Sequence, residues 1–267
     1  MLSLEKKFIE LKNSNRIWAI GSIHGNLKGL VKIHNHISKE FKKNDKIVYL
    51  GNVIGVGNDS SKVIDEILRL RVFLMANFNF DTDDVIFLRG AQEEMWLKLL
   101  ELHISPNPKE VIDWMFAHGV DKTMQSYGLF KEDLIKICNL DTVAISKWTK
   151  KAKSHIESYK GHRQYYSSLT HAAFSESKKI LFVNRGVDIS RPLSAQSDCF
   201  WWGYHGLSEI NKPYYNYIKI VRGYDPKKIG PESNKMLCSL YKGSGFGEYI
   251  VAGLFSGSGD TLDLFEG

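Results

Sequence analysis

The sequence feature that most constrains the fold is a unit of apolar strand, glycine-bounded loop and helix that recurs in the first third of the chain. The first unit has the apolar run Ile17–Ile20, the loop Gly21–Gly25 and a helix that Asn26 can cap. The apolar runs of the next two units are Ile47–Leu50 and Val85–Leu88. Because strands that alternate with helices usually pair in parallel, this pattern predicts an α/β fold with a largely parallel sheet in this part of the chain.

The middle and the end of the chain have different periodicities. Roughly Glu93–Lys160 is helical in pattern and is typical of a helical insertion. Short apolar runs then predict strands at Ile180–Val183, Tyr217–Val221, Lys235–Tyr241, Tyr249–Leu254 and Thr261–Phe265. Because no helices separate these runs, they predict an antiparallel or mixed second sheet. No long linker divides the chain, so we expect residues 1–267 to form one domain with 93–160 inserted in it.

Charge and cysteine content limit the environment and the partners. The net charge of +6 suits an anionic ligand, although surface lysines explain it equally well. Cys138, Cys199 and Cys238 are isolated in the sequence, which is typical of reduced thiols. The amino-terminal stretch has no apolar secretory core, and no apolar run is long enough to span a membrane. We therefore expect a soluble cytoplasmic protein without a membrane partner.

Five loops carry a resemblance to a known family. They are Gly21–Gly25 (GSIHG), Gly51–Gly57 (GNVIGVG), Leu88–Glu94 (LRGAQEE), Phe182–Gly186 (FVNRG) and Val221–Pro226 (VRGYDP). In order and framing they resemble the calcineurin-like metallophosphoesterases, which read GD-x-HG, GD-x-x-DRG, RGNHE, VHAG and GH. The bacterial serine/threonine protein phosphatases and dinucleoside polyphosphate hydrolases are the most similar branch. The resemblance covers about Arg16 to the end and implies an α/β (α+β) fold: a four-layer sandwich of two mixed sheets flanked by helices.

The loops depart from the family where it binds two divalent metals. Ser22, Asn52, Ala91, Asn184 and Tyr224 stand where the family has Asp, Asp, Asn, His and His. Only His24 keeps the family's residue, and Gln92 replaces its acid histidine. Gly55 and Val56 replace its second-loop Asp and Arg. Since divalent cations need anionic oxygens or imidazoles to offset dehydration, we expect no metal, no other cofactor and no catalytic residue.

The resemblance also implies where an anion could bind. In the family's fold the five loops converge, which would bring His24, Asn52, Arg185 and Arg222 around one cleft. Arginine's planar fork suits phosphate and carboxylate, so these four residues are the candidate anion site. Alternatively, the two arginines face solvent or pair with acids such as Asp188, Asp198 or Asp225.

Three functions remain open from the sequence. The first is a pseudophosphatase that binds an anionic small molecule, or a phosphorylated or other protein partner, without hydrolysis. The second is a phosphoesterase with altered metal use, and the third is a structural subunit whose old site is filled. The missing ligands favour the first and third. Aromatic residues such as Trp201 and Trp202 could stack bases, but packing is the favoured interpretation, so a nucleic-acid partner is not expected. Glu93 and Glu94 are interpreted as first-turn acids that the helix dipole favours, rather than a general-base pair.

Overall fold

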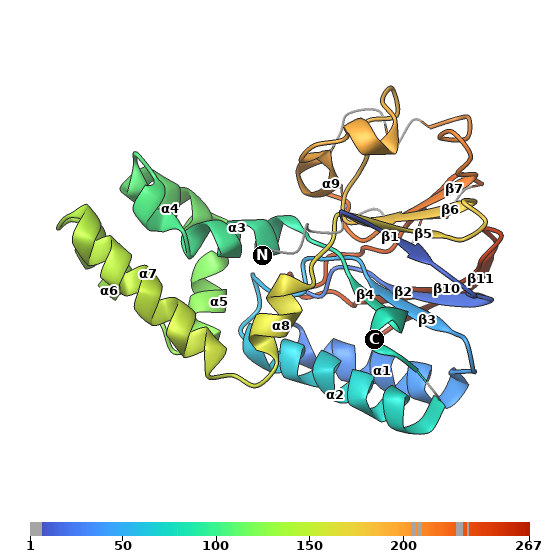
Figure 1. The fold of residues 1–267 in the computed structure, drawn as a ribbon, viewed down its shortest axis with the longest axis horizontal. Coiled ribbons are helices and arrows are strands. Elements are labelled where there is room, and N and C mark those ends of the chain that lie inside the picture. Colours follow the sequence, from blue (N-terminus) through green and yellow to red (C-terminus); the bar gives the residue numbers. More distant parts are fainter. Residues whose placement is uncertain (1–6, 79, 204–206, 208–209, 228–231, 234) are drawn as a thin grey trace.

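A computed structural model describes residues 7–78, 80–203, 207, 210–227, 232–233 and 235–267. Two mixed β-sheets pack face to face, with helices on their outer sides and a helical arm that extends from one end (Figure 1). The α/β sandwich of two mixed sheets with a helical insertion, which the sequence predicted, is confirmed.

The first sheet is built on the three strand–loop–helix units. Its strand order is β11 (Thr261–Glu266), β10 (Val251–Ser256), β2 (Arg16–Ile20), β3 (Lys46–Tyr49) and β4 (Val85–Phe87). Strands β2, β3 and β4 pair in parallel, so the loops that follow them lie at one edge of the sheet. That edge is where the candidate site residues of the first three loops are found.

The second sheet has the order β1 (Phe8–Leu11), β5 (Ala172–Ser175), β6 (Ile180–Val183), β7 (Lys219–Arg222), β9 (Leu237–Ser239) and β8 (Glu232–Ser233). Strands β6, β7 and β9 pair in parallel, whereas β5 and β8 run antiparallel to their neighbours β6 and β9. Fully buried side chains from both sheets, among them Val48, Phe182, Val221 and Phe255, form the core between them.

Two assignments from the sequence are wrong in their sheet membership. Strands β10 and β11 were expected in the second sheet, but β10 pairs antiparallel with β2 and so completes the first. The second sheet is completed instead by β1 and β5, which the pattern did not predict and which pair in parallel with Phe8 opposite Ala172. Pairing between strands that are far apart in the sequence decides which sheet a strand joins, and local periodicity does not predict that pairing.

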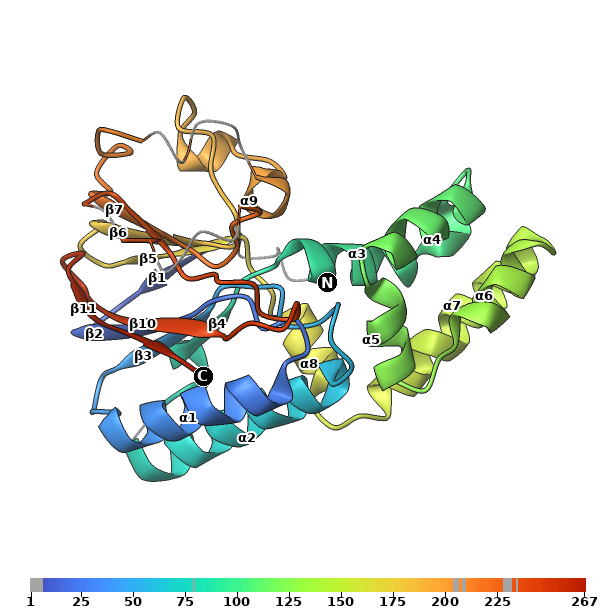
Figure 2. The same cartoon turned by 180° about the vertical axis from the view of Figure 1, so that it is seen from behind.

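Two long helices cover the outer face of the first sheet (Figure 2). Helix α1 (Leu27–Glu40) begins as predicted at Asn26, whose Oδ1 accepts a hydrogen bond from the backbone N–H of Gly29 at 2.9 Å. Helix α2 (Ser60–Phe78) lies beside it. The buried imidazole of His34 on α1 lies 2.7 Å from the Glu66 carboxylate on α2, which joins the two helices.

The arm consists of α3 (Ala91–Leu99), α4 (Pro108–Ala117), α5 (Val120–Ser126), α6 (Lys131–Cys138), α7 (Thr142–Glu157) and α8 (His162–Ser167). It projects away from the sheets, while α3 and α8 connect it to them (Figure 1). Trp96 on α3 stacks on Tyr127 with centroids 5.6 Å apart, inside an apolar cluster that continues to the first sheet.

Smaller elements complete the description. They include the short 3₁₀ turns η1 (Thr82–Asp84), η2 (Leu102–Ile104) and η3 (Leu193–Ala195), and the helix α9 (Cys199–Trp202) beside the second sheet. Within the described ranges, no helix combines the length and apolar character needed to cross a membrane.

Candidate functional site

A cavity of about 620 Å³ lies where the loops that follow the strands meet the arm. His24, Asn52 and Arg185 line it, so the structure brings three of the four predicted site residues together. Two hydrogen bonds hold loops of the two sheets side by side. The Ser22 amide donates to the Gly223 carbonyl at 2.9 Å, and Asn184 Nδ2 donates to the Leu50 carbonyl at 2.6 Å.

His24 is buried and uncharged. Its side chain is 3% exposed, and neither ring nitrogen has a hydrogen-bond partner in the described chain. The ring meets Tyr224, Tyr241 and Phe246 edge-on, with centroids 5.9–6.1 Å apart. Burial lowers the pKa of His24 to about 3, because the apolar surroundings disfavour the imidazolium. At neutral pH this residue therefore offers a ligand a neutral imidazole and no charge.

Asn52 ties the second loop to its neighbours. Its Oδ1 accepts the backbone N–H of Gln92 at 3.1 Å, and its Nδ2 donates to Ser22 Oγ at 3.3 Å. The residue adopts a left-handed backbone with φ of +51°, which asparagine tolerates better than most residues. The amide is thus committed to internal hydrogen bonds, although the residue contributes to the cavity wall.

Glu93 is the structural centre of these loops. Its Oε1 accepts the N–H groups of Val53 and Ile54 at 2.7 and 3.3 Å, and its Oε2 accepts those of Asn52 and Gly90 at 2.8 and 2.9 Å. The carboxyl is fully buried, and burial raises its pKa against the opposing effect of these donors.

The sequence analysis placed Glu93 and Glu94 in the first turn of a helix, and this is confirmed. It did not foresee that Glu93 binds the preceding loop. The available signal was a glutamate three residues after the helix cap Gly90, which is the spacing of a capping box.

The two predicted arginines have different environments. Arg185 lines the cavity, where its guanidinium lies 5.5 Å from the centroid of the Tyr224 ring. Its aliphatic stem packs on Gly203, where a Cβ would lie 2.6 Å from Arg185 Nε. Arg222 is absent from the cavity lining. It is 5% exposed, pairs with the Asp225 carboxylate and donates to Ser239 Oγ. The prediction that Arg222 faces the cleft is therefore corrected: it does not line the cavity and instead pairs with an acid, Asp225, which was the alternative prediction.

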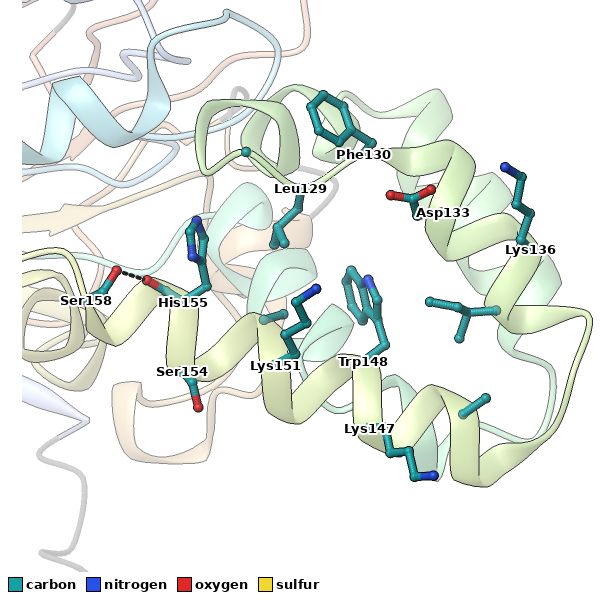
Figure 3. A pocket seen from close by; sticks show the side chains of 14 residues that line it. Leu129, Phe130, Asp133, Lys136, Lys147, Trp148, Lys151, Ser154, His155 and Ser158 are labelled. Atoms are coloured by element: carbon teal, nitrogen blue, oxygen red, sulfur yellow. Dashed lines mark hydrogen bonds between the residues drawn. The ribbon is translucent and has the colours of Figure 1, made fainter.

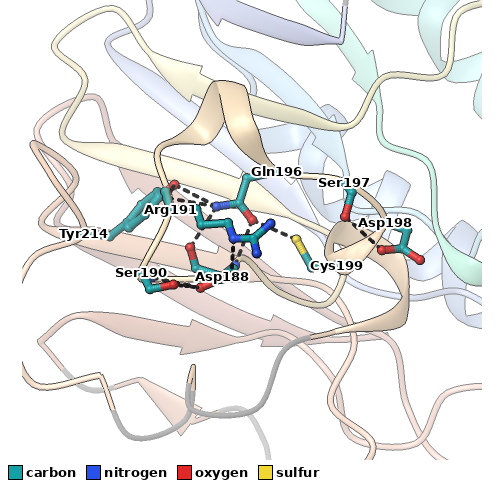
Figure 4. Close-up of polar contacts among 8 residues, drawn as sticks. All are labelled: Asp188, Ser190, Arg191, Gln196, Ser197, Asp198, Cys199 and Tyr214. Atoms are coloured by element: carbon teal, nitrogen blue, oxygen red, sulfur yellow. Dashed lines mark hydrogen bonds and ion pairs between the residues drawn. The ribbon is translucent and has the colours of Figure 1, made fainter.

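The two other acids considered as arginine partners are used elsewhere (Figure 4). Asp188 lies 3.3 Å from Arg191 and accepts the Ser190 hydroxyl at 2.6 Å, while Asp198 accepts the Ser197 hydroxyl at 3.0 Å. No carboxylate among the residues that the structure describes forms an ion pair with Arg185. The cavity therefore retains one guanidinium whose charge is not neutralised by a neighbouring acid.

The donor atoms around the cavity do not fit two divalent metals. The oxygen and nitrogen groups at the former ligand positions are the neutral side chains of Ser22, His24, Asn52, Asn184 and Tyr224. Asn52 uses both its Oδ1 and its Nδ2 in hydrogen bonds to protein. Asn184 uses only its Nδ2, and its buried Oδ1 has no partner among the described residues. Nowhere in the described ranges do three or more His, Cys, Asp or Glu side chains gather in a way that could hold a metal ion. Without carboxylates, this donor set cannot offset the dehydration of two dications.

The arm supplies a wall that the sequence analysis missed. Trp114, Phe116, His118 and Lys122 line the cavity from α4 and α5. The Trp114 ring on α4 meets Trp202, the last residue of α9, with centroids 5.8 Å apart, so the arm contacts the helix that lies beside the second sheet. No local signal marks these residues, because only the folding of the arm brings them to the loops.

The comparisons with known proteins support the fold. A scan of protein-family models and a search of curated protein sequences find no match to this chain. Among solved structures, one provisionally assigned as a diadenosine tetraphosphatase is 17% identical, with a TM-score of 0.57 and 98% of each chain covered. A cold-active protein tyrosine phosphatase from a psychrophilic Shewanella species is 12% identical, with a TM-score of 0.54 over 96% of this chain and 82% of the other. The calcineurin-like metallophosphoesterase fold expected from the loops is confirmed, and at such identities nothing beyond the fold is shown.

Proposed function

We propose that this metallophosphoesterase-fold chain binds an anionic ligand, or a phosphorylated or other anionic group of a protein partner, without hydrolysing it. The observation that carries the proposal is an open cavity lined by cationic side chains, in which neutral side chains stand at the positions where the family has its metal ligands. Arg185 and Lys122 contribute positive charge to the lining, and Asp121 is the lining's one carboxylate.

Loss of the hydrolytic groups supports binding without turnover. Two metals would have to activate a water and clamp the phosphate, and the donor set does not fit them. General acid–base catalysis typically contributes about 10²–10⁴-fold, but Gln92 and Gly55 stand at the positions of the family's acid pair. Gln92 instead donates from Nε2 to the His118 carbonyl at 2.9 Å and so joins the first turn of α3 to the turn between α4 and α5.

The open volume favours ligand binding over a purely structural subunit. Small-molecule sites usually measure about 300–1,000 Å³, and this cavity of about 620 Å³ lies within that range. A hydrogen bond to a charged group contributes about 1.5–3 kcal/mol. Two cations therefore support weak, salt-sensitive binding, to which contacts with the aromatic wall or a protein partner would add.

Thermal-shift titration of the full chain with phosphate, sulfate and nucleotides tests the binding. We expect stabilisation by at least one of these anions, and loss of that stabilisation in Arg185→Ala. Gly203→Ala, which forces Arg185 from its position, should also lose it. Arg163→Ala removes an exposed arginine on α8 and serves as the control. If no anion stabilises the protein, or if Arg163→Ala has the same effect as Arg185→Ala, the chain is better explained as a structural subunit.

A second experiment tests the absence of turnover. After dialysis against Mn²⁺, metal analysis should find no stoichiometric metal, and p-nitrophenyl phosphate should not be hydrolysed above background. Ser22→Asp alone should restore neither property, because the other ligand positions stay neutral. Two bound metals per chain with chelator-sensitive turnover would establish the alternative of a phosphoesterase with altered metal use.

A further inference from the structure

We propose that the groove between α6 and α7 of the arm is a docking site for an acidic amphipathic helix of a partner protein. The groove has a volume of about 1000 Å³ and shares no lining residue with the cavity described above. The proposal is therefore independent of the function proposed for that cavity. It rests on the chemistry of the groove's floor and rim.

The floor of the groove is apolar. Trp148 projects from α7 toward α6, and Leu129 approaches it from the loop before α6 (Figure 3). Half-buried Ile137 extends the same surface, whereas Ala152 is buried. Helix α7 has 16 residues and is about 24 Å long, enough to hold three to four turns of a second helix along it. An apolar trough of this kind accepts leucine-type side chains spaced at i, i+3, i+4 and i+7.

The rim of the groove is basic. Lys136, Lys147 and Lys151 border it, and among the described residues that line it Asp133 is the one acidic side chain. None of these three lysines forms an ion pair with a described residue of the chain. Their positive charges complement the carboxylates that an acidic helix would carry along its polar edges.

Exposed apolar side chains continue the surface past the groove. Phe130 lines it and is 55% exposed, while Leu140, between α6 and α7, and Val143, in the first turn of α7, are 71% and 61% exposed. Large apolar side chains scattered singly on a surface need no explanation, but three on one helical hairpin beside a groove indicate an interaction surface.

These features favour an acidic protein segment over other occupants. A single-stranded nucleic acid stacks successive bases on several exposed aromatic faces, whereas Trp148 is only 7% exposed and Phe130 is 55% exposed. A second copy of the chain carries a net charge of +6, which does not complement a basic rim. The combination of aliphatic floor and unpaired lysines fits a helix with apolar residues on one face and Asp or Glu beside them.

Selection from a displayed library of random 16-residue peptides, with the full chain as bait, tests the proposal. We expect enrichment of peptides with helical apolar spacing and net negative charge. Fluorescence anisotropy of the best peptide should show that Lys147→Glu/Lys151→Glu weakens binding about tenfold or more, because repulsion replaces attraction. Phe130→Ser should weaken it several-fold. Lys150→Glu/Lys153→Glu, on the same helix but outside the groove, is the matched control and should change affinity less than about twofold.

Several results would overturn the proposal. Failure to enrich any peptide is one, and equal weakening by the two lysine pairs is another, since it would indicate unspecific attraction to a basic helix. A poly-uridine RNA, or vesicles containing anionic lipid, that bind better than the peptide and depend on Lys147 and Lys151 would assign the surface to a different partner. A dimer in light scattering that dissociates on Lys147→Glu/Lys151→Glu would assign it to self-association. Circular dichroism of each variant checks that the helices remain folded.

Discussion

The Gln92 side chain occupies the space that a side chain at position 55 would need: a Cβ on Gly55 would lie 2.0 Å from Oε1 of Gln92. Gly55 also has a φ of +86°, in the left-handed region where side chains are strained. These are the two positions at which the family carries its acid pair. A side chain at position 55 therefore requires Gln92 to move or to be replaced, so the two positions are coupled in space.

This coupling predicts strong non-additivity. Gly55→Asp should destabilise the protein substantially, whereas Gln92→Ala should cost less, because it loses one hydrogen bond at the cavity wall. In the double variant the clash is removed, so a double-mutant cycle in urea unfolding should give an interaction energy of about 1–3 kcal/mol. Effects that add within about 0.5 kcal/mol would contradict the steric relationship.

Glu93→Gln tests the carboxylate that organises the loops. Each of its oxygens accepts two backbone N–H groups, so the amide NH₂ must face two donors whichever way it is turned. Two buried unsatisfied donors should cost about 2–6 kcal/mol in urea unfolding. Glu94→Gln removes the ion pair with Arg89, whose atoms lie 3.2 Å apart, and should cost about 1 kcal/mol or less. Equal losses in the two variants would argue against the role given to Glu93.

Stability should fall on acidification because of His24. Burial holds its folded-state pKa at about 3, below the ordinary value of 6.5, so the unfolded chain binds the proton first. This contribution is complete above pH 6.5 and is lost as the pH falls from 6.5 toward 3. Between pH 7 and 5 it amounts to about 2 kcal/mol. Urea unfolding at several pH values should show a shallower slope for His24→Asn, and an unchanged slope in this variant would contradict the prediction.

Substitutions of Arg222 and Arg185 should have opposite effects, the first on stability and the second on anion binding. Arg222→Met leaves the buried Asp225 carboxylate without its partner and should cost about 3–5 kcal/mol. The shift produced by phosphate should persist in this variant, because Arg222 does not line the cavity. Arg185→Met should show the reverse pattern, with a small loss of stability and no phosphate response. A phosphate response abolished by Arg222→Met alone would restore Arg222 to the site.

The sequence determined what local chemistry and spacing can determine. The apolar runs before Gly21, Gly51 and Arg89 became β2, β3 and β4, because a buried parallel strand needs a continuous apolar stretch. Asn26 caps its helix through a contact three residues away. The poor fit to two metals could be predicted from the sequence alone, because the side chains of Ser22, Asn52 and Ala91 cannot carry the negative charge that two metals require.

Only the tertiary structure decided how distant segments meet. Strand β10 joins the first sheet because its pairing partner is β2, more than two hundred residues away in the chain. The arm becomes a cavity wall because the Gln92 backbone amide donates to Asn52 of the second loop and Trp114 meets Trp202 of α9. Arg185 and Arg222 both lie at the end of an apolar strand and are alike in sequence. They differ in their surroundings. Arg222 lies opposite Ser239 of β9 and forms an ion pair with Asp225, whereas Arg185 lies beyond the end of β6 with its guanidinium over the Tyr224 ring. Asp225 is only three residues from Arg222 and could be named from the sequence, but the burial of the pair depends on strand register and on the packing of one sheet against the other.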